Sequence, residues 1–505
     1  DRYVHQTHEV FMLVIAIQGS FDAAKKAIEE ANNKGEAIEL RLDLLKDLEH
    51  VSKLKSLCKL PVIFTLRKKA QGGEFQGSEQ EREAKLLELL PLKPDYVDLE
   101  FDVDPSFAKK VHQSFPDVAI ICSYHDFDKT PDNLENVLTQ MTQMRASIYK
   151  IATFANSSLD SLRMLSFILQ KRREGISLAG MSMGPHGDIT RILAPVVDSL
   201  LTYTSLSSEE KTAPGQVPVD TLEKIYRFST LNQQTKVYAL IGDPVEQSIG
   251  HIAHNTLFKK LKEDAVYVKI LVRSEEVGPF FQLLKTLPFH GFSVTMPLKE
   301  KVGEHLDHIN PQAKKIGAIN TLNLNNEGRW EGFNTDASGA LDAIEEKRQV
   351  AGKKVVILGA GGAARALAYE TIERGGEVLI VNRTEEKAKK LARQLGCEGV
   401  ALERWTKPSY DILMNTTPVG MTTKGLSLIS EKALLKNAVV FDAIMHPKET
   451  PLLILAKNKG CQIVYGNEMF TRQAVKQAEI WLNRPLDTQD LLLTLEHLCH
   501  ALEKS

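Results

Sequence analysis

The stretch RASIYKIATFAN (145–156) has the composition of a buried β-strand with a lysine at its centre. Apolar, aromatic and β-branched side chains stand on both sides of Lys150. A buried ammonium group costs several kcal/mol unless it is paired or neutralised. This strand therefore predicts either an acidic partner for Lys150 or a chemical role for its amine.

Similar apolar runs recur through residues 1–230, separated by helical stretches rich in charged residues. In chain order the eight runs are MLVIAI, AIELRL, PVIFTL, DYVDLE, VAIICSY, SIYKIA, SLAGMS and LLTYTS. Strands that alternate with helices predict a parallel sheet. Eight such units predict an α/β fold of the (β/α)8 TIM barrel type, with its chemistry at the C-terminal ends of the strands.

Composition excludes several classes of function. The 505 residues include 63 basic and 65 acidic side chains, so no polybasic surface for nucleic acid or membrane is expected. The five cysteines are an odd number without a C-x-x-C pair, which is typical of reduced thiols and argues against a zinc site. We expect the cytoplasm as the compartment, or a plastid if a leader preceded Asp1. The oligomeric state stays open, and a monomer is compatible with the sequence.

Polar residues stand at the ends of the predicted barrel strands. In chain order they are Glu39, Arg41, Arg67, Glu100, His125 and Lys150. Neighbouring cations and partial burial lower the pKa of an amine, which a lysine needs to attack a carbonyl. The alternative is a lysine that extends out of the strand end or pairs with a nearby acid. The cations around the same rim favour the nucleophile.

Six motifs in this half resemble type I 3-dehydroquinate dehydratase over residues 12 to about 228. They are ELRLD, FTLR followed by GGE, SYHDFDKTP, YKIA, MSMG with TRI behind it, and TAPGQ. The resemblance implies that Lys150 forms an imine with the substrate ketone and that His125 acts as base and then as acid. It also implies a set of substrate-binding residues: Arg191, Thr212 and Gln216 for the carboxylate, and Glu39, Arg41 and Arg67 for the hydroxyls. Met181 and Met183 would pack over the imine.

One residue departs from this pattern. Gln71 stands where the family commonly has a glutamate that orients the histidine. An amide can still form a hydrogen bond to His125, but it cannot stabilise an imidazolium by charge. We therefore expect a weaker base.

The second half contains a dinucleotide fingerprint in KKVVILGAGGAARALAYE (353–370), where a predicted strand runs into glycines and then a helix. That context places a pyrophosphate on the backbone of Gly359, Gly361, Gly362 and Ala363. The next predicted strand, EVLIV, ends in Asn382, Arg383 and Thr384, with Lys387 one helical turn later. Two cations at this position favour the 2′-phosphate of NADP, the alternative being solvated surface charge.

Motifs around this lobe resemble shikimate dehydrogenase over residues 236 to about 485. They are YALIGDPVEQS, SVTMPLK, GAINTL, GFNTDASG, NRT, NTTPVGM, TPLL and TRQAVKQAE. The resemblance implies that Lys299 and Asp336 form the catalytic pair. It assigns substrate binding to Ser248, Thr295, Asn320, Thr335 and Gln473.

Two departures occur in this half as well. Gly250 replaces the second serine of a Ser-x-Ser-Pro pattern, and Met445 replaces an aromatic residue. His251 and His254 lack a carboxylate or cysteine to complete a metal site, so we assign them to the start of a helix. No metal is expected.

The domain organisation follows from these motifs. We expect a dehydratase barrel in residues 1–230, a polar linker (229–236), a substrate-binding lobe in 236–345 completed by helices in 470–505, and a Rossmann lobe in 346–469. The chain would dehydrate 3-dehydroquinate and then reduce 3-dehydroshikimate with NADPH. One alternative is a catabolic quinate or shikimate dehydrogenase that uses NAD. Another is a metabolite-sensing regulator, against which the four reactive residues Lys150, His125, Lys299 and Asp336 argue.

Overall fold

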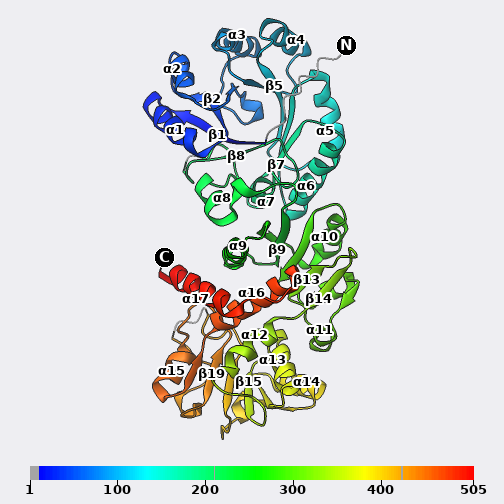
Figure 1. The fold of residues 1–505 in the computed structure, drawn as a ribbon, viewed down its shortest axis with the longest axis vertical. Coiled ribbons are helices and arrows are strands. Elements are labelled where there is room, and N and C mark those ends of the chain that lie inside the picture. Colours follow the sequence, from blue (N-terminus) through cyan, green and yellow to red (C-terminus); the bar gives the residue numbers. More distant parts are fainter. Residues whose placement is uncertain (1–10, 210, 422–424, 505) are drawn as a thin grey trace. The chain divides into compact units, whose positions relative to one another are not determined.

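The computed structural model describes residues 11–209, 211–421 and 425–504, which fall into two compact units (Figure 1). Unit 1 comprises Asp1–Lys236 and Asp264–Pro288, and unit 2 comprises Val237–Glu263 and Phe289–Ser505. The domain boundaries expected from the sequence stay a prediction. In the part of the chain that the structure describes, no helix has both the length and the hydropathy needed to cross a membrane.

Unit 1 is built on an eight-stranded parallel sheet that curls into a nearly closed barrel, as the eight apolar runs predict. The strands are β1 (Met12–Gly19), β2 (Ala37–Leu45), β3 (Val62–Thr65), β4 (Tyr96–Glu100), β5 (Ala119–Asp126), β6 (Ile148–Phe154), β7 (Leu178–Met183) and β8 (Leu201–Thr204). β1 pairs with both β2 and β8. A backbone hydrogen bond from Leu200 N to Leu178 O joins the remaining two edges.

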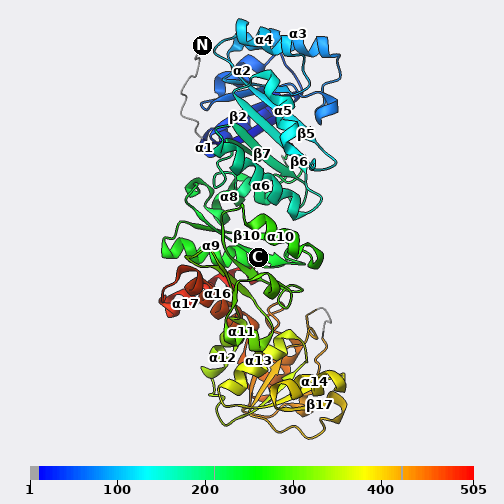
Figure 2. The same ribbon diagram turned by 90° about the vertical axis from the view of Figure 1, so that its right-hand side faces the viewer.

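Helices surround this sheet, as both ribbon views show (Figures 1 and 2). They are α1 (Phe21–Lys34), α2 (Val51–Leu57), α3 (Glu79–Leu89), α4 (Pro105–Ser114), α5 (Leu134–Met141), α6 (Ser158–Arg173), α7 (Asp188–Ile192) and α8 (Val219–Tyr226). Local sequence fixes where they begin. Ser20 caps α1 through the N–H of Ala23, and Ser78 with Glu81 forms a capping box at α3.

The barrel interior changes character along the strands. Inward-facing residues near the strand starts, among them Val14, Ile63 and Ile121, form an apolar core. Because side chains alternate between the two faces of a strand, the residue two positions later faces the same interior. That next layer is polar and includes Lys150 and Glu39. The apolar layer thus forms the floor of a polar mouth.

Unit 1 also contains β10 (Ala265–Leu271) and α10 (Val277–Leu284). Helix α10 packs near α6, where the hydroxyls of Ser166 and Thr286 share a 2.7 Å hydrogen bond.

In unit 2, the strands β9, β11, β13, β14 and β12 are neighbours in that order in one mixed sheet. Their bounds are β9 (Lys236–Gly242), β11 (Phe289–Val294), β12 (His308–Ile309), β13 (Thr321–Leu324) and β14 (Trp330–Phe333). β9 and β11 run parallel, whereas β13 runs antiparallel to β11. Short helix α11 (Pro311–Ile316) follows β12, and α9 (Gly250–Leu261) packs with α16 (Gly466–Leu482) and α17 (Thr488–Lys504) around an apolar cluster.

The second sheet of unit 2 is fully parallel, with the order β17-β16-β15-β18-β19-β20. Its strands are β15 (Lys354–Leu358), β16 (Glu377–Asn382), β17 (Glu398–Ala401), β18 (Ile412–Asn415), β19 (Val439–Asp442) and β20 (Gln462–Val464), and its helices are α13 (Gly362–Glu373), α14 (Glu385–Leu395) and α15 (Pro451–Lys459). This is the strand order of a Rossmann fold, which binds dinucleotides where the order reverses, here between β15 and β18.

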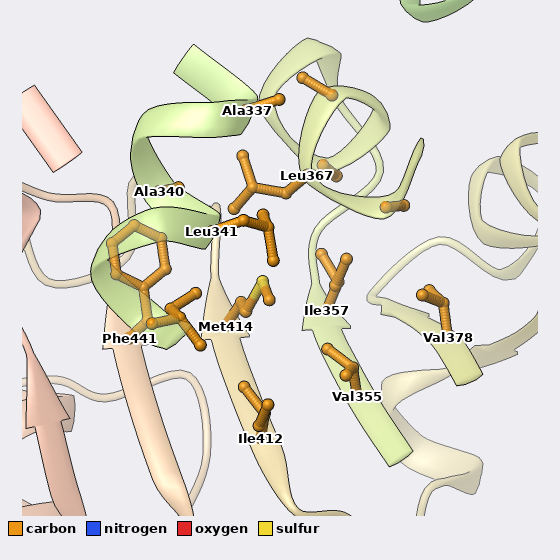
Figure 3. Close-up of a cluster of buried hydrophobic side chains, with 14 of the residues drawn as sticks. Ala337, Ala340, Leu341, Val355, Ile357, Leu367, Val378, Ile412, Met414 and Phe441 are labelled. Carbon is orange, nitrogen blue, oxygen red and sulfur yellow. The ribbon is translucent and has the colours of Figure 1, made fainter. Parts of the chain in front are cut away.

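A buried core joins helix α12 (Asp336–Glu345) to the Rossmann sheet (Figure 3). Ala340 and Leu341 of α12 lie beside Met414 of β18 and Phe441 of β19, whereas Ala337 lies on the side of Leu367 of α13. The first residue of α12 is Asp336, so this packing fixes the helix that begins with one predicted catalytic carboxylate.

Candidate active sites

All the residues predicted for the dehydratase site line one cavity at the C-terminal ends of the barrel strands. They are Glu39, Arg41, Arg67, His125, Lys150, Arg191, Thr212 and Gln216, and the same cavity is lined by Gln71, Phe127, Met181, Met183 and Tyr203. The roles assigned to them stay predictions, but the barrel brings the whole set together.

Lys150 is buried and has an acidic partner that the sequence analysis did not name. Its Nζ lies 2.5 Å from Oδ2 of Asp98 and 3.2 Å from the hydroxyl of Tyr203. Burial lowers the pKa of Lys150, and Arg67 lowers it further, while Asp98 acts in the opposite direction. The amine therefore has both features that the sequence suggested, an acid partner and a reduced pKa.

Asp98, Ser123 and Tyr203 are the residues of this site that sequence reasoning missed. Ser123 Oγ donates to Asp98 Oδ1 at 2.6 Å, and Arg67 Nη1 donates to the same oxygen at 2.7 Å. The signal that could have found two of them is strand alternation, since Asp98 stands two residues before Glu100 and Ser123 two before His125.

His125 is a buried histidine whose charged form is disfavoured. Burial, together with the Arg67 and Lys150 cations, holds the pKa of His125 well below its usual range. The imidazole is therefore neutral near pH 7 and can accept a proton. Gln71 does not orient the ring directly, because its Oε1 accepts a 3.1 Å hydrogen bond from the backbone N–H of His125. Within the described ranges, Nδ1 of His125 has no hydrogen-bond partner.

Arg191 provides a buried positive charge, and Asp188 of the same helix is the acid that acts on it electrostatically. Among the residues that the structure describes, Arg191 makes no ion pair and its Nε has no hydrogen-bond partner. Its Nη1 donates to the backbone oxygen of Tyr203 at 3.2 Å. Burial lowers the pKa of Arg191 to about 10, so the group is still a cation near pH 7. A buried cation of this kind can bind an anionic ligand, and that role of Arg191 stays a prediction.

The other cations of the mouth are already neutralised. Arg41 forms two hydrogen bonds to Asp43, at 3.0 and 2.8 Å, and Arg67 lies beside Asp98 and Glu100. Thr212 and Gln216 hydrogen-bond each other at the cavity wall. An incoming carboxylate would therefore be drawn to Arg191.

The predicted dehydrogenase residues meet at one edge of the mixed sheet of unit 2. Lys299 Nζ lies 2.5 Å from Asp336 Oδ2, and the pair is partly exposed, with side-chain exposures of 35% and 16%. Lys299 follows β11, and Asp336 follows β14. A partly exposed pair adds little to stability, and the catalytic role of this one stays a prediction.

The amide of Asn320 is held in one orientation by its neighbours. Its Oδ1 accepts hydrogen bonds from Thr321 Oγ1 and from the backbone N–H of Thr335, both at 2.8 Å, and its Nδ2 donates to Thr335 Oγ1. Thr335 Oγ1 in turn donates to Gln473 Oε1 at 3.5 Å. Gln477, which the sequence analysis missed, donates to the backbone oxygen of Asn320. Among the described residues, the second N–H of the Asn320 amide has no acceptor, so it is available to a ligand oxygen.

Ser248 and Thr295 lie in the loops that follow the parallel neighbours β9 and β11. The Oγ of Ser248 accepts a 3.1 Å hydrogen bond from the backbone N–H of Gly250, the first residue of α9. Because Gly250 has no side chain, Ser248 supplies the one hydroxyl of the Ser-x-Gly segment.

The nucleotide fingerprint adopts a geometry that fits a pyrophosphate. Gly359 has a φ of +114°, which favours glycine, and a Cβ there would lie 2.5 Å from Thr416 Oγ1. A Cβ on Gly361 would meet nothing within 4 Å. The twelve-residue helix α13 starts there without a side-chain cap, so its first N–H groups are available to phosphate.

Arg383 and Lys387 are both exposed, at the end of β16 and on α14. Neither makes an ion pair with a described residue, whereas the nearby Lys389 pairs with Glu385. Asn382 and Thr384 lie in the same turn, where Asn382 Nδ2 donates to the backbone oxygen of Thr384. Within the described part of the chain, no cluster of three or more His, Cys, Asp and Glu side chains could hold a metal ion.

Comparisons with known proteins cover both halves of the chain. The model of type I 3-dehydroquinase matches residues 13–233. The model of the shikimate dehydrogenase substrate binding domain matches residues 240–322, and that of shikimate/quinate 5-dehydrogenase matches residues 342–444.

Single relatives match both halves of the chain. The bifunctional 3-dehydroquinate dehydratase/shikimate dehydrogenase of Arabidopsis thaliana, a chloroplastic protein, is 37% identical over 89% of this chain and 78% of its own length. The shikimate biosynthesis protein AroDE of Chlamydia pneumoniae is 32% identical over 93% of this chain and 95% of its own length.

A solved structure agrees with the second half. A crystal structure of shikimate dehydrogenase in complex with NADP+ superimposes with a TM-score of 0.50 and 34% identity, and the match covers 53% of this chain and 97% of that one. The chain belongs to the family of bifunctional 3-dehydroquinate dehydratase/shikimate dehydrogenases.

Proposed function

We propose that the two halves catalyse consecutive reactions. The barrel dehydrates 3-dehydroquinate to 3-dehydroshikimate through an imine on Lys150, and the second half reduces 3-dehydroshikimate to shikimate with NADPH. The observation that carries the proposal is the buried Lys150 beside a neutral His125, in the same cavity as the unpaired cation of Arg191.

In the dehydratase reaction, Arg191 binds the substrate carboxylate, and the neutral amine of Lys150 attacks the ketone. The resulting iminium draws electrons from the adjacent carbon, so a modest base can remove its proton. His125 is held neutral by its surroundings, so its ring can take that proton and then return it to the departing hydroxyl. Water leaves, and hydrolysis of the imine frees the product and Lys150.

In the reductase reaction, NADPH supplies a hydride to the ketone carbon, and the protein must protonate the resulting alkoxide. Lys299 is the proton donor, and Asp336 holds it in place through their 2.5 Å contact. The free N–H of Asn320 and the side chain of Gln473 bind substrate hydroxyls. Gly359, Gly361, Gly362 and Ala363 bind the pyrophosphate, and Arg383 and Lys387 bind the 2′-phosphate.

Borohydride trapping tests the imine. Adding borohydride with 3-dehydroquinate should abolish dehydration and add the mass of the reduced adduct to the peptide that contains Lys150. Lys68, a rim lysine paired with Asp102, is the matched control, and Lys68→Ala should still be trapped. An adduct on another lysine, or undiminished dehydration by Lys150→Ala, would end the Schiff-base proposal.

A coupled assay distinguishes the alternatives. With 3-dehydroquinate and NADPH we expect shikimate, and with NADH a far slower reaction, because only NADPH carries a 2′-phosphate. Preferred oxidation of quinate or shikimate with NAD would indicate a catabolic enzyme. Binding of both metabolites without turnover would indicate a sensor.

We also propose that the protein works in a reducing compartment, since all five cysteines are free. The cytoplasm is our first choice and a plastid the alternative. Fractionation of source cells with an antibody to the protein tests this, and recovery from an oxidising compartment would contradict it.

A further inference from the structure

Tyr203 is a buried residue in direct contact with the amine that we propose as nucleophile. It lies on β8, and its hydroxyl oxygen accepts a 3.2 Å hydrogen bond from Lys150 Nζ. The same ammonium lies 4.7 Å from the centroid of the Tyr203 ring. Among the described residues, only Asp98 and Tyr203 are within hydrogen-bond distance of Nζ.

Imine formation requires a proton carrier at this nitrogen. An ammonium that becomes an iminium loses two protons, and the ketone oxygen that leaves as water gains two. No other reactant is needed, so both protons must move from nitrogen to oxygen within the pocket. A group that carries them must contact Nζ and must both accept and donate a proton.

Asp98 is poorly suited to this task. Although its burial acts in the opposite direction, the Arg67 and Lys150 cations hold the pKa of Asp98 far below its usual range. A carboxylate that stays ionised accepts hydrogen bonds but has no proton to give. Asp98 thus anchors the amine.

Tyr203 has the properties that Asp98 lacks. Burial and the neighbouring Glu39 carboxylate hold the pKa of Tyr203 well above its usual value, so the hydroxyl keeps its proton. A neutral hydroxyl accepts through its lone pairs and donates through its hydrogen at the same time. Glu39 lines the same cavity and interacts with that hydroxyl.

We propose that Tyr203 is a catalytic residue of the dehydratase half, which carries protons between the Lys150 nitrogen and the substrate's ketone oxygen. The proposal rests on the imine mechanism of the preceding subsection. Tyr203 first takes a proton from the Lys150 ammonium and gives its own proton to the ketone oxygen. The freed nitrogen lone pair then bonds to the ketone carbon as the C=O electrons move to oxygen. A second transfer makes the oxygen a water molecule, which leaves as the nitrogen lone pair forms the C=N bond. Hydrolysis reverses these steps.

Exchange of the ketone oxygen with solvent isolates these steps from the rest of the reaction. The intact protein is incubated with 3-dehydroshikimate in H2 18O without NADPH, and incorporation of 18O into the ketone is followed by mass spectrometry, with spontaneous exchange subtracted. This exchange requires imine formation and hydrolysis, but no C–H bond is broken.

Tyr203→Phe keeps the ring and removes only the hydroxyl. We expect it to slow the exchange by roughly 100-fold or more, the usual contribution of a general acid or base. Long incubation with borohydride should still convert Lys150 fully to the adduct, since the site is intact and only slow. The kinetic isotope effect on dehydration of 3-dehydroquinate, deuterated at the carbon that loses its proton, should fall toward one in this variant. Tyr124→Phe, a change on β5 where the ring packs against Phe101, should leave exchange unchanged.

Three outcomes would overturn the relay. The first is exchange at the normal rate in Tyr203→Phe. The second is that the rates of exchange and dehydration fall equally in this variant while the isotope effect is unchanged. The third is that Tyr203→Phe never forms the borohydride adduct. The last two would assign Tyr203 a structural role. Normal exchange in Lys150→Ala would instead refute the imine itself, so failure of the relay and failure of the proposed function give different results.

Discussion

Lys150 Nζ and Asp98 Oδ2 lie 2.5 Å apart inside the barrel, although their strands β6 and β4 are separated by β5. The intervening strand contributes Ser123, whose hydroxyl donates to the other oxygen of Asp98. Arg67 donates to that second oxygen as well. One buried carboxylate therefore neutralises two buried cations, and the dehydratase site depends on it for stability as well as for position.

Asp98→Asn should destabilise the barrel strongly, because buried Lys150 loses its countercharge and buried Arg67 keeps only Glu100. Breaking a buried ion pair costs about 3 to 5 kcal/mol. Asp102→Asn is the matched control, since the Lys68–Asp102 pair is exposed and should cost at most about 1 kcal/mol. Hydrogen exchange, followed by mass spectrometry on peptides of β4 and β6 across a urea series, measures the loss of barrel stability in each variant. Similar losses for the two variants would contradict the role given to Asp98.

The pH dependence of stability in unit 2 should depend on His254. Burial lowers the pKa of His254 to about 3, and its Nε2 is 3.1 Å from Gln477 Oε1. Below pH 6.5 the unfolded chain binds a proton at this histidine that the folded protein does not bind. Stability is therefore complete above pH 6.5 and falls as the pH drops, by about 2 kcal/mol between pH 7.5 and 5.

Tryptophan fluorescence measures this effect selectively, because Trp330, Trp405 and Trp481 all lie in unit 2. Urea unfolding at pH 7.5 and 5.0 should show that the unmodified protein loses stability at the lower pH. The same comparison in His254→Asn should show a smaller loss of stability. His308→Asn, a change at an exposed histidine of β12, should behave like the unmodified protein. A full pH dependence in His254→Asn would show that other groups cause it.

The sequence predicts the frame of both sites, because alternation and strand ends are local properties. The eight apolar runs correspond to the eight barrel strands, and the polar residues at their ends, apart from Glu100, face one cavity. Glu100 pairs with Arg82 of α3 instead. Asp98 could have been found by counting two residues back from Glu100. Tyr203 required the three-dimensional structure, since only the closure of β8 onto β1 brings its hydroxyl to Lys150.

Other contacts depend on loop or helix packing that has no local signal. The amide of Gln71 contacts the backbone of His125, not its ring, because the turn that carries it sets the approach. Gln477 stands one helical turn after Gln473. It contacts Asn320, a residue 157 positions earlier in the chain. Packing of α16 creates that contact, so sequence spacing alone does not indicate it.

Cofactor preference should depend on Arg383. Because this exposed cation has no acidic partner among the described residues, its charge is available to a 2′-phosphate. Arg383→Ala should raise the KM for NADPH by about 5- to 150-fold, which corresponds to roughly 1 to 3 kcal/mol, and hardly change the KM for NADH. Lys389→Ala changes a cation of the following helix, α14, that is paired with Glu385, and should alter neither Michaelis constant. Equal losses with both cofactors would show that Arg383 supports the lobe and does not bind the phosphate.

The Ser-x-Gly segment gives a prediction for shikimate binding. The hydroxyl of Ser248 accepts a hydrogen bond from the N–H of Gly250, and a serine at position 250 would add a second donor for the substrate carboxylate. A hydrogen bond to a charged group contributes roughly 1.5 to 3 kcal/mol. Gly250→Ser should therefore lower the KM for shikimate by about ten- to a hundredfold.

Turnover should stay nearly constant in Gly250→Ser, because a carboxylate remote from the reacting carbon is bound alike in the ground and transition states. Gly250→Ala is the control, because it adds the side-chain carbon without a hydroxyl. Comparing the two variants shows the effect of the hydroxyl alone. Steady-state kinetics of shikimate oxidation with NADP+ measures both variants, and the dehydratase reaction serves as the internal control. If the serine variant binds shikimate no better than the alanine variant, the protein already satisfies the carboxylate by another route. His251, the next residue of α9, is then the first donor to replace.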